Sequence, residues 1–418
     1  MKVLVVGSGG REHAISWKLK QSPKVSELYC APGNAGIADD AVCVDVGAED
    51  IPGIVRLAKE KNIEMAVIGP EVPLAMGITD ELEKAGIKTF GPDKNCSQLE
   101  ASKSFTKSFL ARHNIPTAKY KEYTDIDALK ADIGIYGYPM VLKADGLAAG
   151  KGVVLAENAV DAEKAIDEMM GERVFGDAGD KVVVEECLVG TEASMLCFVD
   201  EHTIVPMESA QDYKRVFDGD NGPNTGGMGS YSPSLLFDDE MKKRVMDDIL
   251  APTLKGFQKD GLKFKGVLFV GLMLTKDGPK VIEFNNRFGD PETQSVLMRL
   301  DSDLCEIFES VCDNRLSEQE IKWSDKRAVC VVLASGGYPG DYEKGKVISG
   351  LDKVDEDVVV FHAGTKISDD DVVTSGGRVL GVTAMGATND EARAKAFDNV
   401  KRISFEGMHY REDIGRIL

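Results

Sequence analysis

The sequence contains no apolar run long enough to cross a membrane. Its longest nearly apolar stretch covers residues 266–274, whereas a membrane-spanning helix needs about 20 apolar residues. The apolar residues 3–6 stop at Gly7 and are followed by Arg11 and Glu12, so they do not form a secretory signal. We therefore expect a cytoplasmic protein without a membrane partner.

Cysteine and histidine are scarce and scattered. The chain of 418 residues has 8 Cys and 5 His, with no Cys-x-x-Cys pair and no Cys near a His at a zinc-binding spacing. The histidine positions indicate neither a metal cluster nor a catalytic triad. The cysteines are therefore interpreted as small buried side chains in a reducing cytoplasm.

Positive charge is also in deficit. Lys and Arg number 50 against 70 Asp and Glu, which gives a net charge of −20. A uniformly acidic chain repels a phosphate backbone, so no nucleic-acid partner is expected, and an anionic substrate would need a local basic pocket. The hydrophobic content of 43% excludes wholesale disorder. The length predicts roughly three domains.

The order of apolar runs predicts an α/β and α+β protein. Strands alternate with helices up to residue 92, which is typical of a parallel sheet with helices on its faces. The alternation then becomes irregular, and a small α+β unit begins near Arg327. The predicted strands cover residues 2–6, 27–30, 65–68, 87–90, 140–144, 153–156, 182–186, 266–275, 280–285, 328–333, 358–362 and 378–385. The predicted helices cover residues 11–21, 51–61, 100–113, 159–170, 239–258 and 390–403.

Residues 209–231 show no periodicity and are predicted to form a loop. A loop of this length in a compact domain is usually functional or disordered. Tyr213, Phe217, Met228 and Tyr231 argue against disorder, because a solvated linker does not need such side chains.

The first glycine cluster follows the first predicted strand. Gly7, Gly9 and Gly10 lead into a helix, which suits an anion at the helix N-terminus. A tight turn without a ligand explains them equally well. Glu12 stands where a dinucleotide fingerprint has its third glycine, which argues against a dinucleotide-dependent oxidoreductase.

The second glycine cluster follows the strand that ends at Lys143. The N–H groups of residues 146–152 could cover a polyphosphate, with the lysine as a point charge. Gly152 replaces the Ser or Thr of a P-loop, so this is not that motif. The alternative is an ordinary exposed lysine at a strand end.

Acidic and amide side chains mark a later strand. Glu283 and Asn285 share one face, while Ile282 and Phe284 should face the core. A carboxylate and an amide oxygen are hard ligands suited to Mg²⁺ held jointly with phosphates, and Arg287 could bind a carboxylate or phosphate. A solvated polar face explains Glu283 but not the dense polar run that follows.

The strand at 182–186 also ends in acids. Glu185 is followed seven residues later by Glu192, across a glycine turn. Taken alone, such acids at a strand end are usually solvated.

In their order along the chain, these motifs are similar to those of the ATP-grasp superfamily. A lysine-bearing helix, a lysine strand with a glycine loop, an acid-ended strand and Glu-x-Asn follow one another. Within the superfamily, essentially the whole chain resembles the phosphoribosylamine–glycine ligase family. The motifs that carry the resemblance are VVGSGGREHA at 5–14, APGNAG at 31–36, GPEVPL at 69–74, KADGLAAGKGV at 143–153, GPNTGGMG at 222–229, EFNNRFGDPETQ at 283–294, GGYPGDY at 336–342, HAGT at 362–365 and GGRVL at 376–380.

The resemblance implies an ATP-dependent ligase of purine biosynthesis. Family members join glycine to 5-phosphoribosylamine through glycyl phosphate, giving glycinamide ribonucleotide, ADP and phosphate, with Mg²⁺ or Mn²⁺. We expect a monomer with an N-terminal domain over 1–102, an ATP-grasp domain over 103–325 with a lid at about 118–190, and a C-terminal domain over 326–418. Another ATP-grasp carboxylate–amine ligase is an alternative. A catalytically silent nucleotide-binding protein is a second, although its expected decay at Lys143, Glu283 or Asn285 is not seen.

The resemblance also implies roles for individual residues. The ATP-binding residues are Lys103 and Lys143 at the phosphates (with Lys107 as a weaker candidate), Gly146, Gly150 and Gly152 in the lid, Glu185 and Leu188 at the adenine, and Glu192 at the ribose. The substrate-side residues are Asp212, Arg287 and Asp290, which with Lys143 are also the catalytic candidates, together with Thr225, Gly226, Gly227, Gly9, Gly10 and Glu71. The metal ligands are Glu283 and Asn285. The strand before Glu283 lacks the third acidic ligand that many ATP-grasp enzymes have there.

Overall fold

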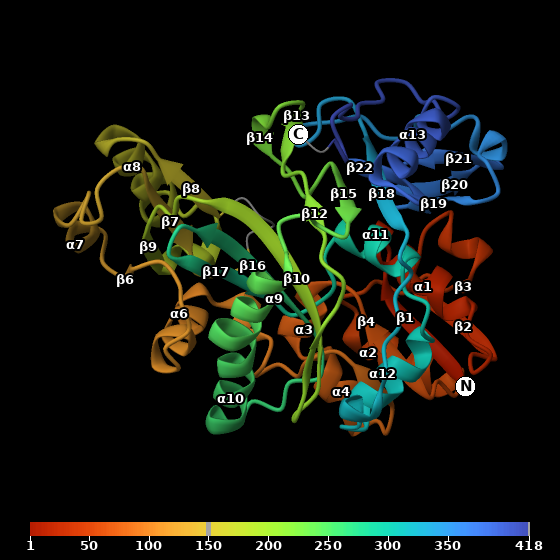
Figure 1. The fold of residues 1–418 in the computed structure, drawn as a ribbon, viewed down its shortest axis with the longest axis horizontal. Helices are drawn as coiled ribbons and strands as arrows, with labels where there is room; N and C mark the ends of the chain where they lie inside the picture. The colour runs from red at the N-terminus through yellow and green to blue at the C-terminus, as the bar shows by residue number, and fades with distance from the viewer. Residues whose placement is uncertain (148–151, 417–418) are drawn as a thin grey trace.

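The computed structural model describes residues 1–147 and 152–416, and it begins with a five-stranded sheet (Figure 1). The strand order is β3-β2-β1-β4-β5, and every neighbouring pair is parallel. The strands are β1 (Lys2–Gly7), β2 (Glu27–Pro32), β3 (Val42–Cys43), β4 (Met65–Ile68) and β5 (Lys88–Phe90). The predicted parallel sheet is therefore confirmed.

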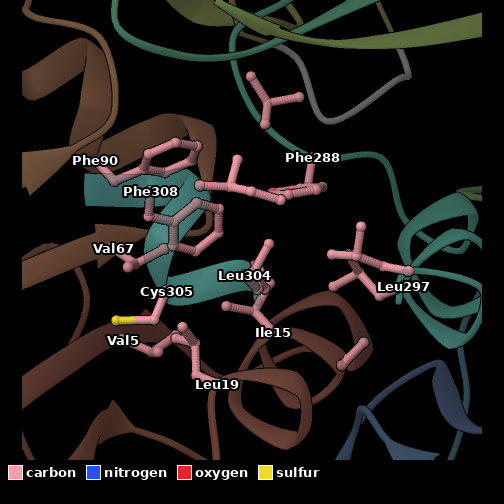
Figure 2. Packing of buried hydrophobic residues seen from close by; sticks show 14 of the residues in the cluster. Val5, Ile15, Leu19, Val67, Phe90, Phe288, Leu297, Leu304, Cys305 and Phe308 are labelled. Carbon is pink, nitrogen blue, oxygen red and sulfur yellow. The ribbon is translucent and has the colours of Figure 1, made fainter. Parts of the chain in front are cut away.

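Helices cover both faces of this sheet. Val3 and Val5 pack with α1 (Gly10–Lys20) and α12 (Leu304–Cys312), whereas the alternate side chains of β1 pack with α2 and α4. The helices of this second face are α2 (Ile51–Glu60) and α4 (Ile78–Lys84), with α3 (Glu71–Met76) before α4. In Figure 2, Phe308 of α12 lies against Phe90 of β5, and their ring centroids are 3.9 Å apart. The N-terminal sheet is therefore buried partly by residues from far along the chain.

Two antiparallel sheets form the middle of the chain. Figure 1 shows the first of them, with order β6-β9-β7-β8, at the left end of the molecule, away from the N-terminal sheet. The first sheet and its helices are β6 (Tyr120–Tyr123), α7 (Ile126–Ala131), β7 (Met140–Ala144), β8 (Val153–Ala156), α8 (Ala159–Ile166) and β9 (Val182–Glu186). The second sheet, with order β11-β10-β16-β17, has β10 (Thr191–Val199), β11 (Ile204–Pro206), β16 (Gly266–Thr275) and β17 (Gly278–Asn285). Between β5 and β6 lie α5 (Gln98–Ala101) and α6 (Lys103–Arg112).

The helix predicted over 239–258 is interrupted once. It consists of α9 (Asp239–Val245), a π-helical turn (Met246–Leu250) and α10 (Ala251–Asp260). Pro252 has no N–H to donate and its ring crowds the carbonyl four residues earlier, so the helix widens at this turn. In the described part of the chain, no helix is long and apolar enough to span a membrane.

Strand β17 contains a bulge that changes the predicted alternation. Ile282 is the extra residue between Val281 and Glu283, both of which pair with β16. Val281 and Phe284 therefore lie in the core. Ile282, which was expected to face the core, is only half-buried. Its carbonyl instead accepts a hydrogen bond from Lys143 Nζ at 3.2 Å.

Residues 209–231 form short strands, so the predicted loop is wrong. Strands β12 and β15 join the C-terminal sheet, whose order is β12-β15-β18-β22-β19. The elements are β12 (Gln211–Asp212), β13 (Arg215–Phe217), β14 (Asn221–Asn224), β15 (Gly229–Ser232), β18 (Arg327–Ala334), β19 (Val358–His362), β20 (Thr365–Ser368), β21 (Asp371–Thr374), β22 (Arg378–Gly386) and α13 (Asn389–Val400). Strands of two to four residues are too short to show a period. The domain boundaries at 102 and 325 stay a prediction.

Helix α1 and the loop after β2 contact the C-terminal sheet at the end of β19. The N–H of His362 donates to Nδ1 of His13 at 2.7 Å. Asn34 Nδ2 donates to the carbonyls of Ser8 and His362, both at 2.8 Å. Helix α11 (Glu292–Met298) adds buried side chains to the same core as α1. These contacts fix one end of the cleft described next.

Candidate active site

A cleft of about 840 Å³ lies where helices α1, α3 and α5, the two middle sheets and the C-terminal part of the chain meet. Ten of the residues singled out from the sequence line it. They are Glu71, Lys103, Gly146, Gly152, Thr225, Gly226, Glu283, Asn285, Arg287 and Asp290. Gly150 lies outside the described residues.

Glu283 and Asn285 offer oxygen ligands on one face of β17. Asn285 Nδ2 donates to Glu283 Oε1 at 3.2 Å, so the amide oxygen is left for another partner. Burial alone would raise the pKa of Glu283, but nearby lysines, above all Lys103 and Lys143, hold it below its ordinary value. An ionised carboxylate beside an amide oxygen fits a hard divalent cation.

The strand next to this pair supplies no further acid. Phe269, which pairs with Asn285, lines the cleft, and β16 contains no acidic residue. Among the described residues, no group of three or more His, Cys, Asp or Glu could hold a metal ion. The candidate ligands on β16 and β17 are therefore Glu283 and Asn285.

Lys143 and Lys107 share one carboxylate behind the cleft wall. Glu185 Oε1 lies 2.9 Å from Lys143 Nζ, and Oε2 lies 2.9 Å from Lys107 Nζ. Lys107 also donates to Thr117 Oγ1 at 2.8 Å. Burial lowers the pKa of Lys107 to about 8, although the charge of Glu185 acts in the opposite direction. The side chain of Glu185, expected near adenine, is thus paired with two lysines.

Lys103 sits at the start of α6, and Asp145 holds that end of the helix. Asp145 accepts hydrogen bonds from the Ser104 N–H at 3.1 Å, the Ser104 hydroxyl at 2.8 Å and the Ser102 hydroxyl at 3.0 Å. Lys181 Nζ lies 3.6 Å from the same carboxylate. Since Asp145 follows β7 directly, it ties the small sheet to the helix that presents Lys103.

Arg287 is held between two acids from the N-terminal part of the chain. Its Nη2 lies 2.9 Å from Glu100 Oε1, and its Nε lies 3.4 Å from Glu71 Oε2. Burial would lower the pKa of Arg287, but these two carboxylates raise it above its ordinary value. The guanidinium is therefore a fixed positive charge on the cleft wall.

Asp290 and Arg378 connect the middle of the chain with the C-terminal sheet. Their side chains lie 3.3 Å apart. Arg378 Nη1 also donates to the carbonyls of Gly226 and Asp290, both at 2.8 Å. Gly227 has a φ of +119°, and a Cβ there would lie 2.4 Å from Pro291. This close approach accounts for the glycine at position 227 of the motif.

Asp212 lies beside two charged residues that the sequence interpretation did not assign. Lys214 Nζ is 2.6 Å from Asp212 Oδ2 and lines the cleft, as does Glu292. Burial and the charge of Asp212 raise the pKa of Glu292 to about 7, against the opposing effects of Lys214 and Arg287. Glu292 belongs to the quoted motif at 283–294, and Lys214 follows Asp212 by two residues, so both were within reach of the sequence.

The side chain of Glu12, in the first turn of α1, fills the turn before this helix. The Gly9 N–H donates to Glu12 Oε2 at 2.6 Å, and Glu12 Oε1 pairs with Arg11 Nε at 2.5 Å. A Cβ at Gly10 would lie 2.6 Å from Gln294 Nε2, so this glycine allows α1 to approach α11. The contact of Gly9 and Gly10 with a sugar phosphate stays a prediction.

Leu188 and Glu192 lie at the connection between β9 and β10. Leu188 is half-buried, and Glu192 is the second residue of β10. Loss of hydration raises the pKa of Glu192, and the charges of Asp212 and Glu283 add to this while Lys214 opposes it. Glu192 is thus electrostatically coupled to the cleft, although it is not among the described lining residues.

The fold and the cleft define an ATP-grasp protein. A biotin carboxylase from Campylobacter jejuni has the same fold, with a TM-score of 0.74 and 16% identity over 98% of this chain and 92% of that chain. The family model of the phosphoribosylglycinamide synthetase ATP-grasp (A) domain matches residues 101–293.

The remaining comparisons identify the family. The N and C domain models of phosphoribosylglycinamide synthetase match residues 1–100 and 328–417. A phosphoribosylamine–glycine ligase from Vibrio vulnificus is 51% identical over 99% of this chain and 98% of that protein. The crystal structure of a phosphoribosylamine–glycine ligase from Thermotoga maritima has a TM-score of 0.86 and 33% identity, over 99% of this chain and 100% of that chain. The chain belongs to the phosphoribosylglycinamide synthetase family.

Proposed function

We propose that the protein joins glycine to 5-phosphoribosylamine at the expense of ATP, giving glycinamide ribonucleotide, ADP and phosphate. The observation that carries this proposal is one cleft that combines Glu283 and Asn285, Lys103, and the segment from Arg287 to Asp290. It occurs in a chain whose three parts all match the family. A carboxylate is a poor acyl donor, so its phosphorylation by ATP supplies the leaving group that amide formation needs.

Residues in the cleft and in the elements beside it are assigned the roles that the family motifs imply. Lys103 and Lys143 bind ATP phosphates, and Glu185, Leu188 and Glu192 lie at the adenine and ribose. Because phosphoryl transfer depends mainly on positioning and charge neutralisation, no catalytic triad is required. Asp145 and Glu185 fix these lysines from behind.

Glu283 and Asn285 would hold a divalent cation, Mg²⁺ or Mn²⁺. When bound, the cation supplies positive charge to the phosphate oxygens during transfer. Glu283 stays ionised for this purpose because the surrounding lysines lower its pKa against the effect of burial.

The acceptor side lies toward the C-terminal sheet. Arg287 and Asp290 would orient glycine and phosphoribosylamine, with Thr225 to Gly227 closing the pocket and Glu71 fixing Arg287. The glycine carboxylate attacks the γ-phosphorus and forms glycyl phosphate, and the sugar amine then displaces phosphate from the acyl carbon. We further propose that the protein is a cytoplasmic monomer, which light scattering after size-exclusion chromatography tests for the oligomeric state.

The decisive assay measures ADP release by the purified protein with Mg-ATP. Glycine and freshly generated phosphoribosylamine are added separately and together. Release that needs both, with other amino acids unable to replace glycine, supports the proposal. Tight ATP binding without dependence on either substrate contradicts it and indicates an ATP-grasp ligase with other substrates.

A further inference from the structure

Most acids at the cleft are held by a cation. The paired acids and their partners are Glu71 and Glu100 with Arg287, Asp290 with Arg378, and Asp212 with Lys214. Glu283 accepts from Asn285 and is the proposed metal ligand. Asp341 also lines the cleft, but it is exposed to solvent. Glu292 is different: the residue is 1% exposed, and its Oε1 has no hydrogen-bond partner among the described residues.

We infer that Glu292 is the catalytic base that takes the proton which the attacking sugar amine must lose. This role rests on the proposed function and concerns its second step. A buried carboxylate oxygen without a partner is costly to maintain. It is therefore expected where a donor arrives during the reaction.

The backbone places this carboxylate at the cleft wall. Glu292 is the first residue of α11 and lines the cleft together with Arg287. A Cβ at position 289 would lie 2.5 Å from Glu292 Oε2, so Gly289 provides the space for the side chain. The charged groups that act on it are Asp212, Lys214, Arg287 and, from the C-terminal sheet, Arg378. Its pKa of about 7 suits proton transfer near neutral pH.

The proton balance of the second step defines what the base must do. The lone pair of the amine nitrogen forms a bond to the acyl carbon of glycyl phosphate, and the carbon–oxygen bond to phosphate breaks, with the electron pair leaving on phosphate. The nitrogen is then cationic and must release one proton to give the amide. Glu292 accepts this proton and returns it to solvent or to the departing phosphate.

The other obvious role of Glu292 is binding the ammonium group of glycine. The charges around Glu292 act in both directions, since Asp212 raises its pKa while Lys214 and Arg287 lower it. Kinetics separates the two roles, because loss of an ammonium site raises KM for glycine, whereas loss of a base lowers kcat.

The test compares Glu292→Gln with the wild type and with Glu240→Gln, a control at an exposed acid in the first turn of α9. Steady-state ADP release gives kcat and KM for glycine and phosphoribosylamine. Glycyl phosphate is trapped separately with hydroxylamine, whose weakly basic nitrogen loses its proton without a strong base. We expect Glu292→Gln to lower kcat with phosphoribosylamine by about 10²–10³-fold, with little change in KM for glycine and hydroxamate formation close to wild type.

Two results would overturn the role. A higher KM for glycine with an unchanged kcat would indicate an ammonium site, and equal loss of both reactions would indicate an earlier or structural effect.

The wild type alone gives an independent check if the variant unfolds. With phosphoribosylamine, the kcat of the wild type should fall as the pH is lowered. With hydroxylamine it should not fall, and identical pH profiles would contradict the role. Wild-type protein that needs neither glycine nor phosphoribosylamine for ADP release would instead refute the proposed function itself.

Discussion

Glu185 and Lys107 form an ion pair of 2.9 Å in which the two side chains are only 4% and 3% exposed. Removing one partner of a buried pair leaves an uncompensated charge, which typically costs about 3–5 kcal/mol. Glu185→Ala also removes the acidic partner of Lys143. We therefore expect the free energy of unfolding, measured in urea, to fall by about that amount.

The neighbouring acid provides the control for this measurement. Glu186 is half-buried and lies 3.9 Å from Lys280. Glu186→Gln keeps the acceptor for the Lys119 N–H and should change stability by less than about 1 kcal/mol. A similar loss of unfolding free energy in both variants would show that the buried ion pairs of Glu185 contribute no more than a surface pair.

Asp145→Ala should weaken ATP binding through the start of α6. The substitution removes three hydrogen bonds at Ser102 and Ser104, which flank Lys103. Because charge-assisted bonds are worth about 1.5–3 kcal/mol, we expect KM for ATP to rise by about tenfold or more. Partial rescue in Asp145→Asn, and normal kinetics in Ser108→Ala on an exposed part of the same helix, would separate positioning from general damage.

Glu283→Ala should abolish metal-dependent turnover while the fold is retained. Loss of a ligand removes charge stabilisation of several kcal/mol, so kcat should fall by at least about 100-fold. ADP release titrated with MgCl₂ and MnCl₂ measures the effect, and circular dichroism monitors the fold. Asp277→Asn, in the turn between β16 and β17, is the control, and near-normal activity of Glu283→Ala would refute the metal assignment.

Stability should depend on pH through Glu292. Burial and Asp212 raise its pKa from 4.5 to about 7, so between these values the folded protein keeps a proton that the unfolded chain has released. This contribution to stability is complete below pH 4.5 and is lost as the pH rises through 7. Glu292→Gln lacks the titration. Its unfolding free energy relative to wild type should rise by on the order of 1 kcal/mol per pH unit in this window, whereas parallel urea curves would contradict the shift.

The sequence predicts well those strands that are short, mainly apolar runs. The strands at Met65–Ile68, Met140–Ala144, Val153–Ala156, Val182–Glu186 and Val358–His362 have the predicted ends. Ile282 escaped prediction because a bulge depends on the partner strand, which one strand's own pattern does not reveal. Strands β12 and β15 were not predicted because they are short and because their sheet is completed by β18, which lies almost one hundred residues later in the chain.

The candidate site was predictable to the extent that its residues sit in recognisable motifs. Glu283, Asn285 and Arg287 line the cleft as their spacing indicated. Lys107 was only a weak candidate, and its burial follows from Glu185, which a distant strand supplies. Asp145 could not be assigned, since its importance arises from contacts with a different segment of the chain.

Strand β15 lies between β12 and β18, so the C-terminal sheet combines strands from two distant segments of the chain. A protein truncated after residue 325 would lose the partner of β15 and leave its backbone hydrogen-bonding groups exposed. It would also uncover Met228 and Tyr231, which belong to the C-terminal core. The C-terminal segment therefore does not form a separate unit. Chimaeras of two relatives should fold only when residues 211–232 and 327–416 come from the same parent.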